Sequence, residues 1–141
     1  MLTLICGIPN AGKTTYSSKY DNVIHLDDMH IRGGKYNNCN ILAGKTEGDV
    51  VVEGVYVTAK QRRELISSCI RKSPKICIWI DTPLDVCIER EKKYRKRPSC
   101  VVRGHHYKFE QPTYDEGWDE IIVIQGDKKW LTKNKHGRAV M

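Results

Sequence analysis

The chain has 141 residues, 40% of them hydrophobic, and a formal net charge of +7 at pH 7. A chain of this length forms one domain and buries roughly two-thirds of the surface that its unfolded form exposes. It has no apolar run near the ~20 residues that span a membrane, and a strand expected from Leu2 leaves no room for a signal peptide. We therefore expect a cytoplasmic protein, and its positive charge favours a polyanionic partner.

The six cysteines are scattered along the chain and form no C-x-x-C pair. Structural zinc sites usually contain such pairs, so this pattern favours small apolar core residues instead. His105 and His106 are adjacent, and adjacent side chains rarely point to one metal. A metal site built from cysteine and histidine is therefore not expected.

The first expected element is a buried strand over Leu2–Cys6, which leads into a phosphate-binding motif. Residues 7–14 read GIPNAGKT and fit the pattern G-x-x-x-x-G-K-[ST] without a mismatch. In this pattern the glycines turn backbone N–H groups toward the phosphates of ATP, Lys13 reaches the β- and γ-phosphate oxygens, and the Thr14 hydroxyl binds Mg²⁺. A helix from Lys13 to Tyr20 follows. The residues expected to contact the nucleotide are Asn10, Ala11, Gly12, Lys13, Thr14 and Thr15.

The second expected strand, over Asn22–Leu26, ends at the aspartates Asp27 and Asp28. Transfer of a phosphoryl group to a hydroxyl usually needs a carboxylate that accepts the hydroxyl proton. The end of this strand lies across the crevice from the phosphate loop, so we interpret Asp27 as the catalytic base. The alternative is that Asp27 is a helix N-cap, a role that Asp28 can equally fill. The polar, turn-rich residues 33–48 are expected to form a mobile segment.

Two further buried strands are predicted over Val50–Val52 and Ile76–Ile80, and the first of them ends at Glu53. Glu53 either holds a Mg²⁺-bound water or orients the acceptor, and the alternative is a polar residue that ends the strand. Between the two strands, residues 58–61 have the form of a capping box. The helix that it begins is expected to run to about Lys72, with an apolar face made of Leu65, Ile66, Cys69 and Ile70.

The next expected helix has Thr82 as its N-cap and Pro83 as its first residue. Three basic residues near its end fall at i, i+3 and i+7 and are expected to share one face: Arg90, Lys93 and Arg97. Arginines in this region are candidates for a lid that closes on the transferring phosphate, because guanidinium geometry matches phosphate oxygens. The lid candidates are Arg90, Arg95 and Arg97, and at least one of them is expected to be only solvated.

A short helix over residues 101–108 and a last strand over Ile121–Ile124 complete the expected elements. Strands that alternate with helices at these spacings predict an α/β fold, with about five parallel strands and helices on both faces. Ligands bind at the carboxyl ends of such strands. The features expected at this one rim are the phosphate loop, Asp27, Glu53 and Asp81.

Four features together resemble the kinase domain of polynucleotide 5′-hydroxyl kinases. They are the G-x-P-x-x-G-K-T loop, an aspartate at the end of the second strand, and the stretches Asp81–Arg90 and Phe109–Trp118. The resemblance spans about residues 1–125 and implies a P-loop kinase fold with a basic helical lid. It also implies transfer of the γ-phosphate of ATP, with Mg²⁺, to a 5′-OH end of DNA or RNA. The catalytic residues that it implies are Lys13, Asp27, Arg90 and Arg95, with Thr14 at the metal.

The acceptor side of the chain departs from this resemblance. These kinases often have an arginine three residues after the base, where it holds an acceptor phosphate, whereas this chain has His30 there and Arg32 two residues later. Glu53-Gly54-Val55 also stands in place of their Asp-Thr-Asn. The motifs therefore specify the use of ATP more closely than the acceptor. The candidate acceptor contacts are His30, Arg32 and Glu53.

Basic residues are concentrated in residues 90–97 and 128–138, which are either polyanion-binding surfaces or solvated faces. We assign residues 1–127 to the kinase domain and residues 128–141 to a basic C-terminal tail of the same domain. Two alternatives to a polynucleotide kinase stay open. One is a kinase that acts on a nucleoside, a sugar or a hydroxylated base in DNA. The other is a nucleotide-gated nucleic-acid-binding protein, in which the P-loop is a switch and the tail binds the phosphate backbone.

Overall fold

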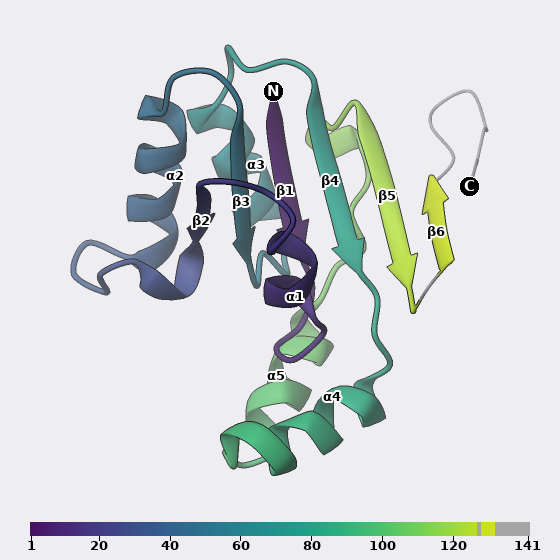
Figure 1. The fold of residues 1–141 in the computed structure, drawn as a ribbon. Helices are drawn as coiled ribbons and strands as arrows, with labels where there is room; N and C mark the ends of the chain where they lie inside the picture. Colours follow the sequence, from purple (N-terminus) through teal and green to yellow (C-terminus); the bar gives the residue numbers. More distant parts are fainter. Residues whose placement is uncertain (127, 132–141) are drawn as a thin grey trace.

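A six-stranded sheet runs through the middle of the molecule, in the order β2-β3-β1-β4-β5-β6 (Figure 1). The structure is a computed structural model that describes residues 1–126 and 128–131. Strands β1 to β5 are parallel, as expected, and β6 is antiparallel to β5. Strand β6 occupies the start of the expected basic tail, and residues 132–141 lie outside the described residues. The strands are β1 Leu2–Cys6, β2 Val23–His25, β3 Val50–Gly54, β4 Lys75–Ile80, β5 Glu120–Gln125 and β6 Lys128–Leu131.

Strand β1 lies at the centre of the sheet, between β3 and β4, and all five of its residues are buried. The apolar runs of β1, β3 and β4 are typical of parallel strands that are covered on both faces. Cys6 pairs with Gly54 on β3 and with Trp79 on β4, so the three strands end at nearly the same level. This alignment places the loop after β1 beside the ends of its two neighbours.

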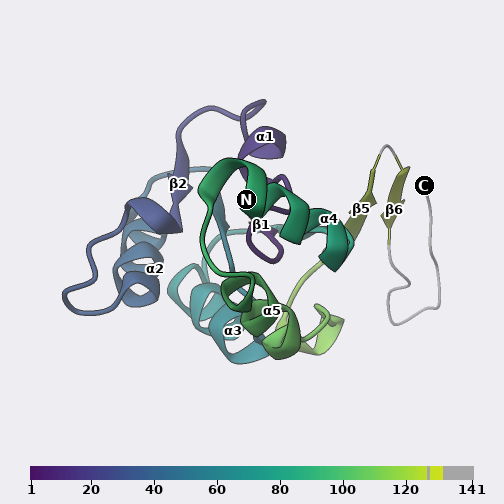
Figure 2. The same ribbon diagram turned by 90° about the horizontal axis from the view of Figure 1, so that it is seen from below.

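Helices α2 and α3 cover one face of the sheet, and the short helix α1 lies on the other (Figures 1 and 2). Helices α4 and α5 lie beyond the carboxyl ends of the strands, below the sheet in Figure 1. None of the helices in the described part of the chain has the length and hydrophobicity needed to cross a membrane. The helical elements are α1 Lys13–Ser17, η1 Leu26–Asp28, α2 Lys35–Lys45, α3 Ala59–Ser68, α4 Leu84–Arg90, η2 Glu91–Arg95, α5 Cys100–Lys108 and η3 Tyr114–Glu116.

Helix α2 lies within residues 33–48, the polar, turn-rich stretch that is expected to be mobile and for which no helix is predicted. Its sequence is rich in asparagine, which has a low helix propensity, so propensity alone does not predict it. Tertiary packing stabilises the helix instead. Cys39 and Ala43 are buried in the core, and the Asn40 side chain accepts a 2.9 Å hydrogen bond from the Tyr56 hydroxyl. Gly44 lets α2 approach α3, because a Cβ atom there would collide with the carbonyl oxygen of Ser68.

The other α-helices lie where the sequence predicts them, and their observed bounds differ from the predicted ones mainly at the ends. Helix α1 stops at Ser17, and α3 stops at Ser68 rather than near residue 72, which leaves Ile70 exposed. The capping box of α3 is confirmed, since the side chains of Thr58 and Gln61 bond to each other's backbone N–H groups. Thr82 is not an N-cap, because Pro83 occupies that position and the Thr82 hydroxyl bonds elsewhere.

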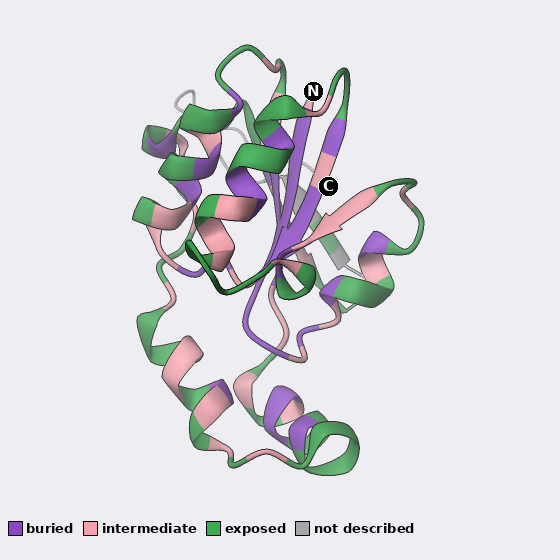
Figure 3. Ribbon diagram, turned by 90° about the vertical axis from the view of Figure 1, so that its left-hand side faces the viewer, coloured by how far each residue is buried: buried purple, intermediate pink, exposed green. Residues whose placement is uncertain are grey.

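Buried apolar side chains form two clusters, on opposite faces of the largely buried sheet (Figure 3). One cluster lies under α2 and α3, and the other extends from the sheet through Ile8 and Ala11 to α4 and α5. Five of the six cysteines are buried, which confirms that most of them are small core residues, and Cys100 is exposed. Among the described residues, no group of His, Cys, Asp or Glu side chains is arranged to hold a metal by itself.

A buried ion pair explains part of the stretch Phe109–Trp118. Arg62 on α3 donates to both carboxylate oxygens of Glu116, at 2.6 and 3.0 Å, and both side chains are fully buried. The Trp118 indole N–H donates to the same carboxylate at 3.0 Å. The remaining Arg62 donors bond to the carbonyl oxygens of Tyr56 and Glu110. The ion pair within this stretch therefore anchors α3 to η3.

Candidate active site

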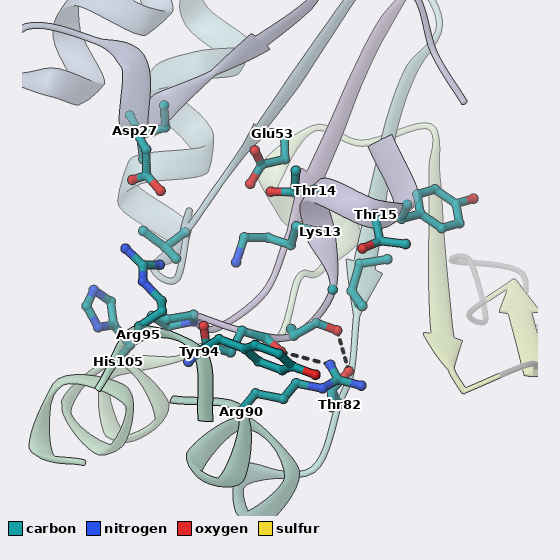
Figure 4. A pocket seen from close by; sticks show the side chains of 18 of the residues that line it. Lys13, Thr14, Thr15, Asp27, Glu53, Thr82, Arg90, Tyr94, Arg95 and His105 are labelled. Carbon is teal, nitrogen blue, oxygen red and sulfur yellow. Dashed lines mark hydrogen bonds between the residues drawn. The ribbon is translucent and has the colours of Figure 1, made fainter. Parts of the chain in front are cut away.

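A cleft of about 950 Å³ lies at the carboxyl ends of the parallel strands, between the loop after β1 and the elements α4, η2 and α5 (Figure 4). Its volume is near the upper end of the ~300–1,000 Å³ range that is typical of small-molecule sites. The cleft contains most of the side chains that the sequence selected. The predicted residues that line it are Asn10, Ala11, Gly12, Lys13, Thr14, Thr15, Asp27, Glu53, Arg90, Arg95 and Arg97.

The loop after β1 has the backbone of a phosphate-binding loop. Asn10 and Gly12 have positive φ angles of 68° and 104°, which turn the chain tightly before α1. Three carbonyl oxygens of the loop are already paired. Lys13 Nζ donates to Ile8 at 2.8 Å, Arg90 to Asn10 at 2.9 Å, and the Thr82 hydroxyl to Ala11 at 2.6 Å. A carbonyl oxygen that faced the phosphate would repel it. Because these three oxygens are bonded to donors, they do not oppose phosphate binding at the loop.

Lys13 lies at the bottom of the cleft, and only 7% of it is exposed. Burial lowers the pKa of its amine, because removal from water disfavours the charged form. Among the charged groups that oppose this shift, Glu53 has the largest effect and Asp27 a smaller one. Figure 4 shows the lysine side chain extended into the cleft below Glu53. The site therefore holds a desolvated cation that gains from an anionic ligand.

Asp27 lies in η1, directly after β2, and its side chain points into the cleft (Figure 4). It is 72% exposed, and its nearest cation in the described part of the chain is Lys35, with 4.0 Å between Oδ1 and Nζ. The N-cap of η1 is His25 and that of α2 is Gly34, so Asp27 caps neither helix. The alternative interpretation of Asp27 as an N-cap is therefore wrong, and its carboxylate stays available to a ligand.

Glu53, the fourth residue of β3, is nearly buried and has a partner that the sequence analysis did not identify. Oε1 of Glu53 lies 2.6 Å from Nδ1 of His25. His25 ends β2 and is the register partner of Glu53, so strand pairing brings the two side chains together. A signal was present, because both residues lie near the ends of predicted strands, but the strand order is needed to pair them.

The π-helical turn η2 changes which basic residues reach the cleft. Lys96 donates its backbone N–H to the carbonyl of Glu91, five residues earlier, so the chain is wider here than in an α-helix. The expectation that Arg90, Lys93 and Arg97 share one face is wrong for Lys93, which does not line the cleft. Tyr94 and Arg95 line it instead.

The three lid arginines have different surroundings. Arg90 is bonded to the Asn10 carbonyl, and Arg97 forms 2.6 and 3.0 Å hydrogen bonds with the carboxylate of Glu91. The Arg95 guanidinium makes no hydrogen bond or ion pair within the described residues, and it points into the cleft in Figure 4. Arg95 is thus the arginine that is free to meet a ligand without breaking an existing bond.

Two other predicted residues lie outside this cleft. The side chains of His30 and Arg32 are exposed, and their backbone carbonyls accept hydrogen bonds from Asn38. Asp81 directly follows β4, as predicted, but it does not line the cleft and accepts a 2.9 Å bond from Gln125. The cleft contains further polar side chains that the sequence analysis did not select. These are Tyr16, Lys35, Tyr36, Thr82, Tyr94 and His105.

The cleft offers oxygen ligands that suit Mg²⁺. The Thr14 hydroxyl lines the cleft and is not hydrogen bonded to another described side chain or backbone group, and Glu53 contributes a carboxylate. Mg²⁺ is usually held by one or two protein oxygens together with substrate phosphates and water, rather than by a cage of side chains. The donor set therefore fits a Mg²⁺ ion that enters with a nucleotide.

No protein-family model and no curated protein matches the chain. Solved structures do match its fold. Kti12 from Chaetomium thermophilum, in complex with ADP-AlF3, has 13% identity and a TM-score of 0.66, with 90% of each chain covered.

Two kinases give similar matches. A gluconokinase from Sinorhizobium meliloti has 15% identity and a TM-score of 0.64, over 89% of this chain and 82% of the other. The APS kinase CysC from Mycobacterium tuberculosis, in complex with AMPPNP and APS, has 15% identity and a TM-score of 0.58, over 90% and 88%. At such identities the likeness concerns the fold alone. This chain has the P-loop kinase fold that its sequence predicts.

Proposed function

We propose that the protein is an ATP- and Mg²⁺-dependent phosphotransferase with a hydroxyl group as acceptor. The observation that carries the proposal is the convergence in one cleft of Lys13, Thr14, Asp27 and Arg95. Phosphoryl transfer requires little more than positioning, charge stabilisation and a group that accepts the hydroxyl proton. Likeness in fold to structures that contain ADP-AlF3 and AMPPNP supports a nucleotide as the donor.

Each residue then has one role. Lys13 and the P-loop N–H groups bind the β- and γ-phosphates, and the Thr14 hydroxyl and the Glu53 carboxylate hold the metal, directly or through water. Mg²⁺, when bound, neutralises charge on these phosphates. Asp27 accepts the proton of the attacking hydroxyl, and its exposure leaves room for an acceptor. Arg95 stabilises the charge of the transferring group, because it has no competing bond in the described structure.

We further propose that the acceptor is a 5′-OH end of DNA or RNA, which would make the protein a polynucleotide kinase. The sequence resemblance and the net charge of +7 support this acceptor. His30 does not line the cleft, but Lys35 on α2 does, 4.0 Å from Asp27. Lys35 is therefore the residue that we assign to the phosphate next to the attacked hydroxyl, in place of the arginine that the related kinases use.

A small-molecule acceptor is the second candidate. It is favoured by the likeness to a gluconokinase and to an APS kinase, and by the position of His30 and Arg32 outside the cleft. In this case the protein would phosphorylate a sugar, a nucleoside or a similar compound. Both candidates share the donor side of the cleft and differ only in the acceptor.

Transfer of phosphate from γ-labelled ATP with Mg²⁺ tests both candidates. The acceptors are a 5′-OH DNA oligonucleotide, a 5′-OH RNA and a mixture of nucleosides and sugar acids, with a 5′-phosphorylated oligonucleotide as the control. We expect label on the 5′-OH ends and none on the blocked control. Label on a small molecule alone would replace the polynucleotide acceptor with the second candidate. Release of label to water alone, or no consumption of ATP, would contradict a phosphotransferase.

A further inference from the structure

His25 contacts the candidate active site but has no role in the proposed chemistry. Its Nδ1 atom lies 2.6 Å from Oε1 of Glu53, and one third of the His25 side chain is exposed. An ionised carboxylate can only accept hydrogen bonds, so Nδ1 carries the hydrogen and donates it. The distance is short, as expected for a hydrogen bond to a charged group.

This bond leaves one oxygen of Glu53 free. Oε1 is held by His25, whereas Oε2 has no hydrogen-bond partner within the described residues. The described side chains include no buried nitrogen or oxygen atom without a partner, so Oε2 must be open to solvent. Glu53 lines the cleft and lies beside Thr14 and above Lys13 in Figure 4. The free oxygen is therefore available on the P-loop side of the cleft.

The backbone alone does not fix this orientation. Glu53 has three rotatable side-chain bonds, and its carboxylate is held by one partner in the described structure. Without His25, the carboxylate is free to turn toward Lys13 or toward bulk water. The register of β2 and β3 places the imidazole where it prevents this rotation.

We propose that His25 is a positioning residue, which holds Glu53 so that its second oxygen serves the metal on the P-loop side. The inference rests on the proposed function, and it assigns Glu53 to the metal rather than to the acceptor. Side chains that orient a metal-binding group typically account for ~10–100-fold in metal affinity when they are removed. His25 therefore affects the metal through Glu53 and makes no contact with the nucleotide.

The test is binding of Mn²⁺ to the protein in the presence of ADP, measured by electron paramagnetic resonance. His25→Phe removes the donor, and His25→Asn retains an N–H donor near the position of Nδ1. His106→Gln is the matched control, because His106 is exposed and does not line this cleft. Binding of ADP without metal and the Tm are measured for each variant, so that misfolding is recognised.

We expect His25→Phe to weaken Mn²⁺ binding by about 10-fold or more, with ADP binding in EDTA unchanged. His25→Asn should recover most of the affinity, and His106→Gln should match the wild type. Mn²⁺ binding by His25→Phe at the wild-type level would overturn the inference. A loss that His25→Asn does not restore would also overturn it, because the role of His25 would then be general packing.

Failure of the inference differs from failure of the proposed function. A wild-type protein that transfers phosphate, and whose Mn²⁺ affinity does not depend on His25, keeps its function and loses this assignment. A protein whose Mn²⁺ affinity in the presence of ADP depends on His25, but which phosphorylates no acceptor, keeps the assignment and loses the function. If His25→Phe does not fold, His25→Ala with and without added imidazole replaces it, and restoration of Mn²⁺ binding by imidazole is then required.

Discussion

The side-chain amide of Asn10 donates a 3.0 Å hydrogen bond to Oε1 of Glu91, which joins the apex of the P-loop to the start of the π-helical turn. The same carboxylate accepts hydrogen bonds from the Arg97 guanidinium and from the Arg97 backbone N–H. Glu91 is fully buried, so these bonds are shielded from water. One carboxylate thus joins the phosphate loop to η2 and Arg97.

Replacing Glu91 by glutamine is expected to lower the Tm and to reduce the effect of acid on stability. The Arg97 hydrogen bonds hold the pKa of Glu91 at about 2, below its usual value of 4.5. A carboxyl group whose pKa is lower in the folded state stabilises it above pH 4.5, and this contribution is lost as the pH falls from about 4.5 toward 2.

The measurement is the free energy of unfolding from pH 7 to pH 2, with Glu89→Gln as the control. Glu89 lies in α4, two residues before Glu91, but is 77% exposed. The wild type and Glu89→Gln should lose stability more steeply below pH 4.5 than Glu91→Gln does. If the free energy of unfolding changed equally with pH in all three proteins, Glu91 would not be the group that titrates.

Asp27→Asn is expected to reduce turnover by roughly 10²–10⁴-fold, because the amide cannot accept the hydroxyl proton. Nucleotide affinity should change little, since the P-loop is intact. Asp28→Asn is the matched control, because Asp28 is the next residue and does not line the cleft. Steady-state kinetics and a nucleotide titration check both. A fully active Asp27→Asn enzyme would remove Asp27 from the role of base.

Arg95→Ala should mainly lower turnover, whereas Arg97→Ala should mainly lower stability. Arg95 has no partner in the described structure, so its loss should lower turnover by roughly 10²–10³-fold and leave the Tm unchanged. Loss of Arg97 leaves the buried carboxylate of Glu91 with fewer donors, so the Tm should fall by several degrees. Thermal unfolding and turnover of both variants separate these roles, and a large fall in the Tm of Arg95→Ala would contradict the assignment.

Gly44→Ala is expected to destabilise the protein, although alanine favours helices. An added Cβ would meet the Ser68 backbone, and such overpacking typically costs about 1–3 kcal/mol, against a gain of roughly 1 kcal/mol in propensity. Gly104→Ala on α5 is the control, because nothing lies within 4 Å of a Cβ atom there. In denaturant unfolding, Gly44→Ala should lower the free energy of unfolding and Gly104→Ala should raise it. Stabilisation by both would mean that α2 and α3 can separate freely.

The sequence predicts the parallel strands and the P-loop correctly for a physical reason. A strand that is covered on both faces, such as β1, must be largely apolar along its length, and phosphate binding requires glycine and lysine at fixed positions. The Thr58 capping box is equally local, since its bonds join residues three apart. Features of this kind depend only on residues that are close in the chain, so they can be predicted without knowledge of the fold.

Most of the features that sequence reasoning missed depend on residues that are far apart in the chain. Helix α2 is stabilised by its packing on α3, and its own polar sequence gives no sign of this. Thr82 bonds to the Ala11 carbonyl, 71 residues away, instead of capping the nearest helix. The pairing of His25 with Glu53 requires the strand order. The π-helical turn before Lys96 is local, but the sequence pattern predicts a regular helix there. Candidate site residues could thus be selected, but their partners could not.

The central position of β1 has a consequence for the order in which the molecule is assembled. Its hydrogen-bonding neighbours, β3 and β4, are 44 or more positions further along the chain, and β4 ends at Ile80. During synthesis the first strand therefore emerges long before either partner exists. The nucleotide loop that follows it is held in place only after Thr82 and Arg90 have also been made. A nascent chain that ends before Arg90 thus carries the complete nucleotide motif but lacks the contacts that shape it.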